Sequence, residues 1–193
     1  MRLQPYFRIG AAILMLCGLC SADSVDRVAV VIDKKVITES EVVDDLRLTE
    51  FLNGQPLDLG PVARRDAAEH LVDQELVRRE MENGGTARPT AAKSDALLRQ
   101  FRQEHFKTPA AYHAALEKYG ITEDQLKERL VWQVMAIQFT DLRFHPPQPE
   151  QGSQSADRAA TDGAAASVDQ QMDAWLKQAR SNTKITFKPE AFR

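Results

Sequence analysis

The sequence predicts a mostly helical domain that has a small β-hairpin near its N-terminal end and is completed by a C-terminal helix and strand. Only 7% of the 193 residues are aromatic and nine are glycine, and the chain is rich in Ala, Leu, Glu and Arg, which favour helices. Capping-box patterns mark helix starts at Thr38–Glu41, Thr122–Gln125 and Ser167–Gln170. Two short runs, Val28–Ile32 and Ile185–Phe187, are typical of strands.

The first strand is expected to turn at Asp33–Lys35 and to return through Val36–Ile37. Thr38 then caps a helix, and Asn53–Gly54 ends it because both residues tolerate left-handed backbone. A second helix is predicted from Pro61, which suits a first helical position, to the stop at Asn83–Gly85. The apolar side of this second helix is formed by Ala68, Leu71, Val72, Leu76, Val77 and Met81.

Thr90 predicts a third helix, and Thr108–Pro109 predicts a short fourth helix that ends at Gly120. The helix that Thr122 opens is the most apolar in the chain and has two apolar sides. One side carries Leu126, Leu130, Val134, Ile137 and Phe144, and the other carries Val131, Met135, Phe139 and Leu142. A helix that is apolar on two sides is buried by neighbours on both, so we expect it at the centre of the fold.

Residues 146–166 interrupt this pattern with a proline-rich start and a polar Ala/Ser/Gly-rich remainder, which predicts a flexible linker. Structure is expected to resume at Ser167, where Val168, Met172, Trp175, Leu176 and Ala179 follow helical spacing. An isolated strand leaves its amides and carbonyls unpaired. We therefore expect residues 167–193 to return across the linker, so that the last strand lies near the first strand or its hairpin and completes the domain of residues 23–145.

Residues 1–22 are typical of a cleaved signal peptide, which predicts a periplasmic protein. Arg2 and Arg8 give a positive start, the apolar run Ile9–Leu19 is too short to span a bilayer, and small residues precede Asp23. After cleavage we expect no stable membrane insertion. An uncleaved anchor and a lipoprotein modified at Cys20 are the alternatives.

Composition narrows the possible chemistry of the mature chain. Cys17 and Cys20 both lie in the predicted signal, so the mature chain would have no disulfide, no cysteine zinc site and no thiol nucleophile. Its formal charge would be −5, because two arginines are removed from a chain of charge −3. The arginines of the second helix alternate with acids, which predicts an ion-paired surface in solvent and no nucleic-acid binding. Gly84–Gly85 is no phosphate loop, because no Lys-Ser/Thr follows it.

The remaining candidate residues, apart from Trp132, which stays unassigned, have structural explanations. His105 and His113 flank a turn but lack a third metal ligand, and His70 lies beside Glu69 without a serine that could complete a triad. His145 falls at a helix C-terminus, where a cation is favoured. We expect the acid pairs Asp44–Asp45 and Glu123–Asp124 to be solvated near helix starts, and Trp175 to be core, whereas Trp132 falls outside the main apolar stripe. No catalytic, cofactor or metal residue is predicted, and no peptide-binding residue is assigned.

Three segments together resemble the N-terminal chaperone domain of the SurA-type periplasmic foldases. They are the opening strand and turn followed by Val-Ile-Thr-Glu-Ser-Glu-Val (36–42), the long helix entered through Tyr119–Leu126, and Trp175–Arg180 followed by the last strand. In those foldases one or two parvulin-type isomerase domains lie between the long helix and the C-terminal return. Here only residues 145–166 occupy that place, which is too short for such a domain.

The resemblance implies a chaperone that needs no ATP, cofactor or metal, binds unfolded outer-membrane or secreted polypeptides, and is not an enzyme. Its oligomeric state, monomer or oligomer, is left open by the sequence. One alternative is a peptidyl-prolyl isomerase by family membership only, and the other is a structural subunit of a periplasmic complex. An exposed apolar groove would favour client binding, whereas a uniformly charged surface would favour the structural role.

Overall fold

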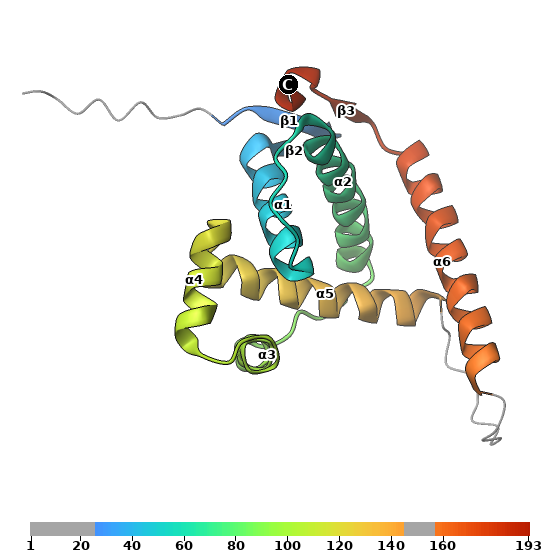
Figure 1. The fold of residues 1–193 in the computed structure, drawn as a ribbon. Coiled ribbons are helices and arrows are strands. Elements are labelled where there is room, and N and C mark those ends of the chain that lie inside the picture. Colours follow the sequence, from blue (N-terminus) through green and yellow to red (C-terminus); the bar gives the residue numbers. More distant parts are fainter. Residues whose placement is uncertain (1–25, 145–156) are drawn as a thin grey trace, which may run out of the picture.

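The computed structural model describes residues 26–144 and 157–193, and it has the predicted mostly helical fold with a small sheet (Figure 1). In chain order its elements are β1 (Val28–Ile32), β2 (Lys35–Thr38), α1 (Glu39–Asn53), α2 (Pro61–Asn83), α3 (Ala91–His105), α4 (Pro109–Tyr119), α5 (Glu123–Phe144), α6 (Asp157–Ser181), β3 (Ile185–Phe187) and the 3-10 helix η1 (Pro189–Phe192). The predicted signal segment, residues 1–22, lies outside the described residues.

The sheet joins the two ends of the described chain. β1 is its middle strand and pairs antiparallel with β2 on one side and with β3 on the other. Val30 lies opposite Ile37 of β2 and opposite Phe187 of β3. The Lys188 amide donates to the Ala29 carbonyl at 2.8 Å. The prediction that the C-terminal strand returns to the first strand is therefore confirmed.

Local chemistry sets the helix boundaries that the sequence predicts. Thr38 and Glu41 form a complete capping box, in which the Thr38 amide donates to the Glu41 carboxylate at 2.7 Å. α1 stops at Gly54, whose φ of 65° lies in the left-handed region that glycine adopts without strain. Thr122 and Gln125 form the second predicted box at the start of α5.

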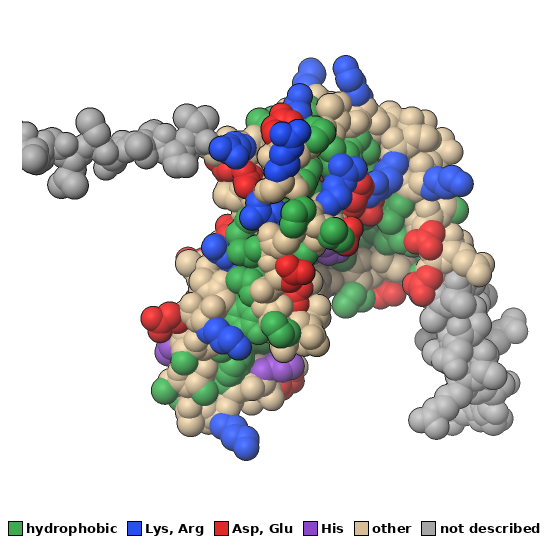
Figure 2. All heavy atoms as spheres, turned by 45° about the horizontal axis from the view of Figure 1, so that its top comes forward, with side chains coloured by type: hydrophobic (Ala, Val, Ile, Leu, Met, Phe, Trp, Pro, Cys, Tyr) green, Lys and Arg blue, Asp and Glu red, His purple; other side chains and the backbone are tan. Residues whose placement is uncertain are grey.

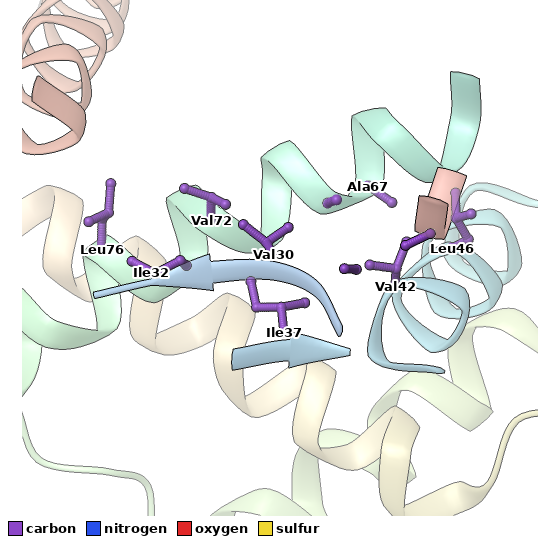
Figure 3. Close-up of a cluster of buried hydrophobic side chains, with 11 residues drawn as sticks. Val30, Ile32, Ile37, Val42, Leu46, Ala67, Val72 and Leu76 are labelled. Carbon is purple, nitrogen blue, oxygen red and sulfur yellow. The ribbon is translucent and has the colours of Figure 1, made fainter. Parts of the chain in front are cut away.

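The first core cluster lies between the sheet and the helices α1 and α2 (Figure 3). Val30 and Ile32 from β1 meet Val72 and Leu76 from α2, and all four side chains are at most 5% exposed. The C-terminal segment closes this cluster with the buried Ala191 and the partly buried Phe187, Phe192 and Ile185. The core thus depends on residues from both ends of the chain.

A second cluster lies at the other end of α1, where α3, α4 and α5 meet it. Its buried members are Leu48, Phe51, Leu98, Tyr112, Leu116, Tyr119, Ile121 and Leu126. α1 contributes to both clusters and therefore connects the sheet layer to the helical layer that α3, α4 and α5 form (Figure 1).

The predicted start of the last helix at Ser167 is wrong, because α6 begins at Asp157. Residues 157–166 of the predicted 146–166 linker are therefore helical, and Ser167 lies inside the helix. The physical reason is composition: this stretch contains five alanines, and alanine has the highest helix propensity, which outweighs the lack of an apolar stripe. The rest of the predicted linker lies outside the described residues.

α6 is held against α2 by one arginine. Arg180 donates to the Asp73 carboxylate at 2.6 Å, to the Glu69 carboxylate at 2.7 Å and to the Glu69 carbonyl at 3.0 Å. The hydrogen bond with Asp73 raises the pKa of Arg180 although burial opposes this. Trp175 is half-buried and packs at the junction of the first cluster and a third cluster around Val77, Met81 and Phe139.

The prediction that the long apolar helix lies at the centre of the fold is also wrong. α5 crosses the ends of α1 and α2 and runs from α4 to α6 (Figure 1). Only Leu126, Val131 and Phe139 are buried in it, whereas Ile137 is 61% and Leu142 is 74% exposed. Both apolar sides contribute buried residues, Leu126 to the second cluster and Phe139 to the third, but the C-terminal half of the helix stays largely on the surface.

Candidate functional site: an apolar cleft beside α5

A cleft of about 690 Å³ opens between α5 on one side and β2, α1 and α2 on the other. This volume lies within the range of about 300–1,000 Å³ that is typical of ligand pockets. Its walls come from different elements because α5 crosses the ends of α1 and α2 (Figure 1).

The floor of the cleft is apolar and comes from all four elements. It consists of Ile37, Leu48, Leu71, Met81, Val131, Trp132 and Met135. Ile37, Met81 and Val131 are at most 4% exposed, while Trp132 and Met135 are half-buried and give the floor its accessible surface. The two methionines make this surface adaptable, because an unbranched thioether side chain can fill differently shaped gaps.

The rim of the cleft is charged and carries more acids than bases. The acids of the rim are Glu41, Asp44, Glu82, Asp124 and Glu128, and its bases are Lys35, Arg78 and Arg88, whereas Asp45, Glu75 and Arg129 line the cleft with side chains at most 12% exposed. Most of these charges are paired within the protein: Arg78 bonds Glu75 at 3.1 Å, and Arg88 bonds Glu128. Figure 2 shows one face of the molecule, on which hydrophobic side chains form a broken band among charged ones.

Asp45 and Arg129 anchor α5 to α1 at the inner wall of the cleft. Their side chains are 6% and 9% exposed, and the Arg129 guanidinium lies 2.5 Å from the Asp45 carboxylate. Arg129 also donates to the Asp45 carbonyl at 3.2 Å and to the Thr49 hydroxyl at 3.1 Å. This pair connects α5 to α1, and either charge would be costly to bury without the other.

The expectation that Asp44–Asp45 is a solvated pair is therefore wrong for Asp45. Asp44 is half-buried and accepts a hydrogen bond from Gln125 at 2.9 Å, which ties α1 to the start of α5. The sequence does carry a signal for the burial of Asp45, since it follows Val42 by three positions and Leu46 follows it directly. An acid at that spacing lies on the apolar side of the helix.

The second acid pair is half-exposed or exposed, and it binds cations on neighbouring turns and helices. Glu123 accepts from Arg102 of α3 at 3.3 Å, and the fully solvated Asp124 lies 3.5 Å from the Lys127 ammonium. Trp132, which the sequence left unassigned, lies in the cleft floor with the Arg78 guanidinium 5.2 Å from its ring.

The histidines lie on different parts of the fold. His105 packs against Phe101 with ring centroids 4.5 Å apart, and His113 lies beside Tyr112. His70 Nδ1 lies 3.1 Å from the Gln74 amide and 3.7 Å from the Asp45 carboxylate. Within residues 26–144 and 157–193 no group of three or more His, Cys, Asp or Glu side chains is arranged to hold a metal ion. His145 lies outside this part of the chain.

The fold and the cleft together define a helical domain with one broad, apolar-floored groove. No helix among the described residues is long and apolar enough to cross a membrane. No known family model matches the sequence, and no curated protein matches it either.

Proposed function

We propose that this protein binds apolar segments of unfolded polypeptides in the cleft beside α5 and thereby delays their aggregation. The observation that carries the proposal is the combination of an apolar floor with an open mouth and a charged rim. Apolar segments of unfolded chains bury surface on such a floor, at about 25 cal/mol for each Å² removed from water. The charged rim stays hydrated and keeps the empty cleft soluble.

Two features of the sequence support the chaperone class. The first is the resemblance of residues 26–187 to the N-terminal domain of SurA-type foldases, which have this kind of client. The second separates a chaperone from an isomerase: the segment between α5 and α6 contains only residues 145–156, which are too few for an isomerase domain. We therefore propose binding without prolyl isomerisation and without ATP.

The test is an aggregation assay with a denatured outer-membrane protein that is diluted into buffer with the full chain. We expect light scattering to rise more slowly as the molar ratio of protein to client increases, because captured segments cannot associate with one another. In a protease-coupled prolyl-peptide assay the same sample should not accelerate isomerisation. Unchanged scattering at large molar excess would contradict the chaperone proposal and favour the structural subunit.

The cleft itself is tested by Trp132→Ala, which removes the largest side chain from the floor. We expect the concentration that halves aggregation to rise several-fold, because the lost ring area no longer contacts the client. Ile137→Ala is the matched control, since Ile137 is 61% exposed on the same helix and does not line the cleft. Equal activity of the two variants at equal folded fraction would place binding elsewhere.

We also propose that the protein acts outside the cytoplasm. The proposal rests on Arg2, Arg8 and the apolar run Ile9–Leu19 in the sequence. Mass spectrometry of the protein from its native host should give an N-terminus at Asp23. A soluble cytoplasmic protein that still begins at Met1 would contradict the proposal.

A further inference from the structure

A second, smaller pocket lies away from the cleft, between the end of α3 and the start of α4. Its volume is about 320 Å³, and its wall includes Arg99, Arg102, Phe106, Lys107, Thr108 and Tyr112. Thr108 caps α4 by accepting a hydrogen bond from the Ala111 amide at 3.2 Å. The positive end of the α4 dipole therefore adds to the charge of the pocket.

Tyr112 supplies an observation that the packing of the fold leaves unexplained. The residue is 1% exposed, and among the described residues its hydroxyl oxygen is the only buried side-chain nitrogen or oxygen without a hydrogen-bond partner. Leaving a buried hydroxyl unsatisfied costs about 1–3 kcal/mol. Phenylalanine would fill the same space without that penalty, so tyrosine at this position indicates a hydrogen-bond partner from outside the protein, a water molecule or a ligand.

The hydroxyl is a hydrogen-bond donor at neutral pH. Burial, reinforced by the negative charge of Glu123, raises the pKa of Tyr112 to about 12. Arg102 covers one face of the ring, with its guanidinium 4.8 Å from the ring centroid, and it also bonds Glu123 at 3.3 Å. Arg102 is half-buried and also lines the pocket, so an anion there would compete with Glu123 for its guanidinium.

The charged side chains around the pocket indicate which kind of ligand the Tyr112 hydroxyl would bind. Arg99 and Lys107 are exposed, and neither has an ion-pair partner in the part of the chain that the structure describes. Arg102 has one, Glu123, which neutralises part of its charge. Two unpaired cations, a helix N-terminus and a buried hydroxyl donor together match a ligand that has oxygen acceptors and negative charge.

We propose that the pocket between α3 and α4 binds a small oxyanion group, a phosphate or a carboxylate, and that Tyr112 donates a hydrogen bond to it. Arg99 and Lys107 attract the anion, and Arg102 exchanges its contact with Glu123 for the ligand. This site is independent of the apolar cleft, so its test and the aggregation assay can fail separately.

The experiment measures the melting temperature of the full chain as inorganic phosphate or acetate is added, against sodium chloride at equal ionic strength. We expect a saturable rise with one or both anions, because a ligand that binds only the folded state stabilises it. In Tyr112→Phe we expect an apparent affinity at least about tenfold weaker, since a hydrogen bond to a charged group is lost. Without anion, this variant should melt at the same temperature as the wild type or higher.

The matched control is Tyr119→Phe, which removes a hydroxyl that already donates to the Gln55 carbonyl at 2.7 Å. We expect it to lower the melting temperature and to leave the anion affinity unchanged. If Tyr112→Phe does not fold, the double variant Arg99→Gln/Lys107→Gln, which changes two exposed residues, tests the proposal instead. We expect its melting temperature not to rise when the anion is added. A response to acetate assigns the site to carboxylates such as a peptide terminus, and a response to phosphate alone assigns it to phosphates. No saturable response in the wild type, or equal affinity in Tyr112→Phe, would overturn the proposal.

Discussion

Deletion of residues 184–193 is expected to abolish the cooperative unfolding of the whole chain. The deletion removes β3 and η1, leaves one edge of β1 unpaired, and takes Ile185, Phe187, Ala191 and Phe192 away from the first core cluster. A fully buried large apolar side chain contributes about 1.5–3 kcal/mol, so these partly buried groups together contribute roughly 5 kcal/mol. That is comparable to the whole stability of a typical domain, about 5–15 kcal/mol.

Thermal unfolding followed by circular dichroism, together with binding of a hydrophobic dye, measures this effect. Single substitutions at Thr186 separate the contribution of strand pairing from that of the apolar side chains that the deletion removes. The Lys188 amide donates to the Ala29 carbonyl, and the Asp33 amide donates to the Lys184 carbonyl. Hydrogen-bonded pairs alternate along antiparallel strands, so the pair between these two, Val31 and Thr186, is also hydrogen-bonded. Thr186→Pro should therefore weaken the sheet, whereas Thr186→Ala should be nearly neutral. A truncated chain that melts as cooperatively and as high as the full chain would show that the C-terminal segment is an appendage.

Removal of one partner of the buried ion pair between Asp45 and Arg129 should have the next largest effect. We expect Arg129→Met to lower the free energy of unfolding by about 3–5 kcal/mol, because it leaves the Asp45 carboxylate buried without its cation. The double variant Asp45→Leu/Arg129→Met should recover most of this loss, since it leaves no buried charge.

Urea denaturation gives these free energies, and Arg88→Met is the matched control. Arg88 also bonds an acid, Glu128, but both side chains are more than half exposed. Exposed pairs contribute at most about 1 kcal/mol. If Arg129→Met destabilised the protein no more than Arg88→Met does, the pair would not be the anchor between α1 and α5.

Most of the fold could be predicted from the sequence because its signals are local and consistent. The capping residues Thr38, Thr90, Thr108 and Thr122 each start a helix where predicted, and the unpaired apolar strand β1 required a partner, which β3 provides. The start of α6 was mispredicted because alanine propensity has no periodic signature. The position of α5 was mispredicted because a pattern shows which sides are apolar but not how far along the helix its neighbours reach, and Ile137 and Leu142 stay exposed near its end.

The candidate site was less predictable, because a cleft depends on how helices cross. Trp132 could not be assigned from its own helix, since its neighbours in the floor come from α1, α2 and β2. The burial of Asp45 depends on Arg129, 84 positions later in the chain. Tyr112 shows only helical spacing in the sequence, and the unsatisfied state of its hydroxyl becomes visible only when every surrounding atom is in place.

The pairing of the two chain ends in one sheet has a consequence for biosynthesis. The Lys184 amide donates to the Asp33 carboxylate across 151 positions of sequence, so β1 obtains its second partner only after the segment that contains β3 has been made. At about 5–20 residues per second, β1 and its hairpin would wait roughly 8–30 s with one open edge. Long-range pairing of this kind also slows folding, because the ends must meet before any contact compensates the entropy that is lost. Until residue 184 has been made, one edge of β1 therefore stays open to pairing with strands of other chains.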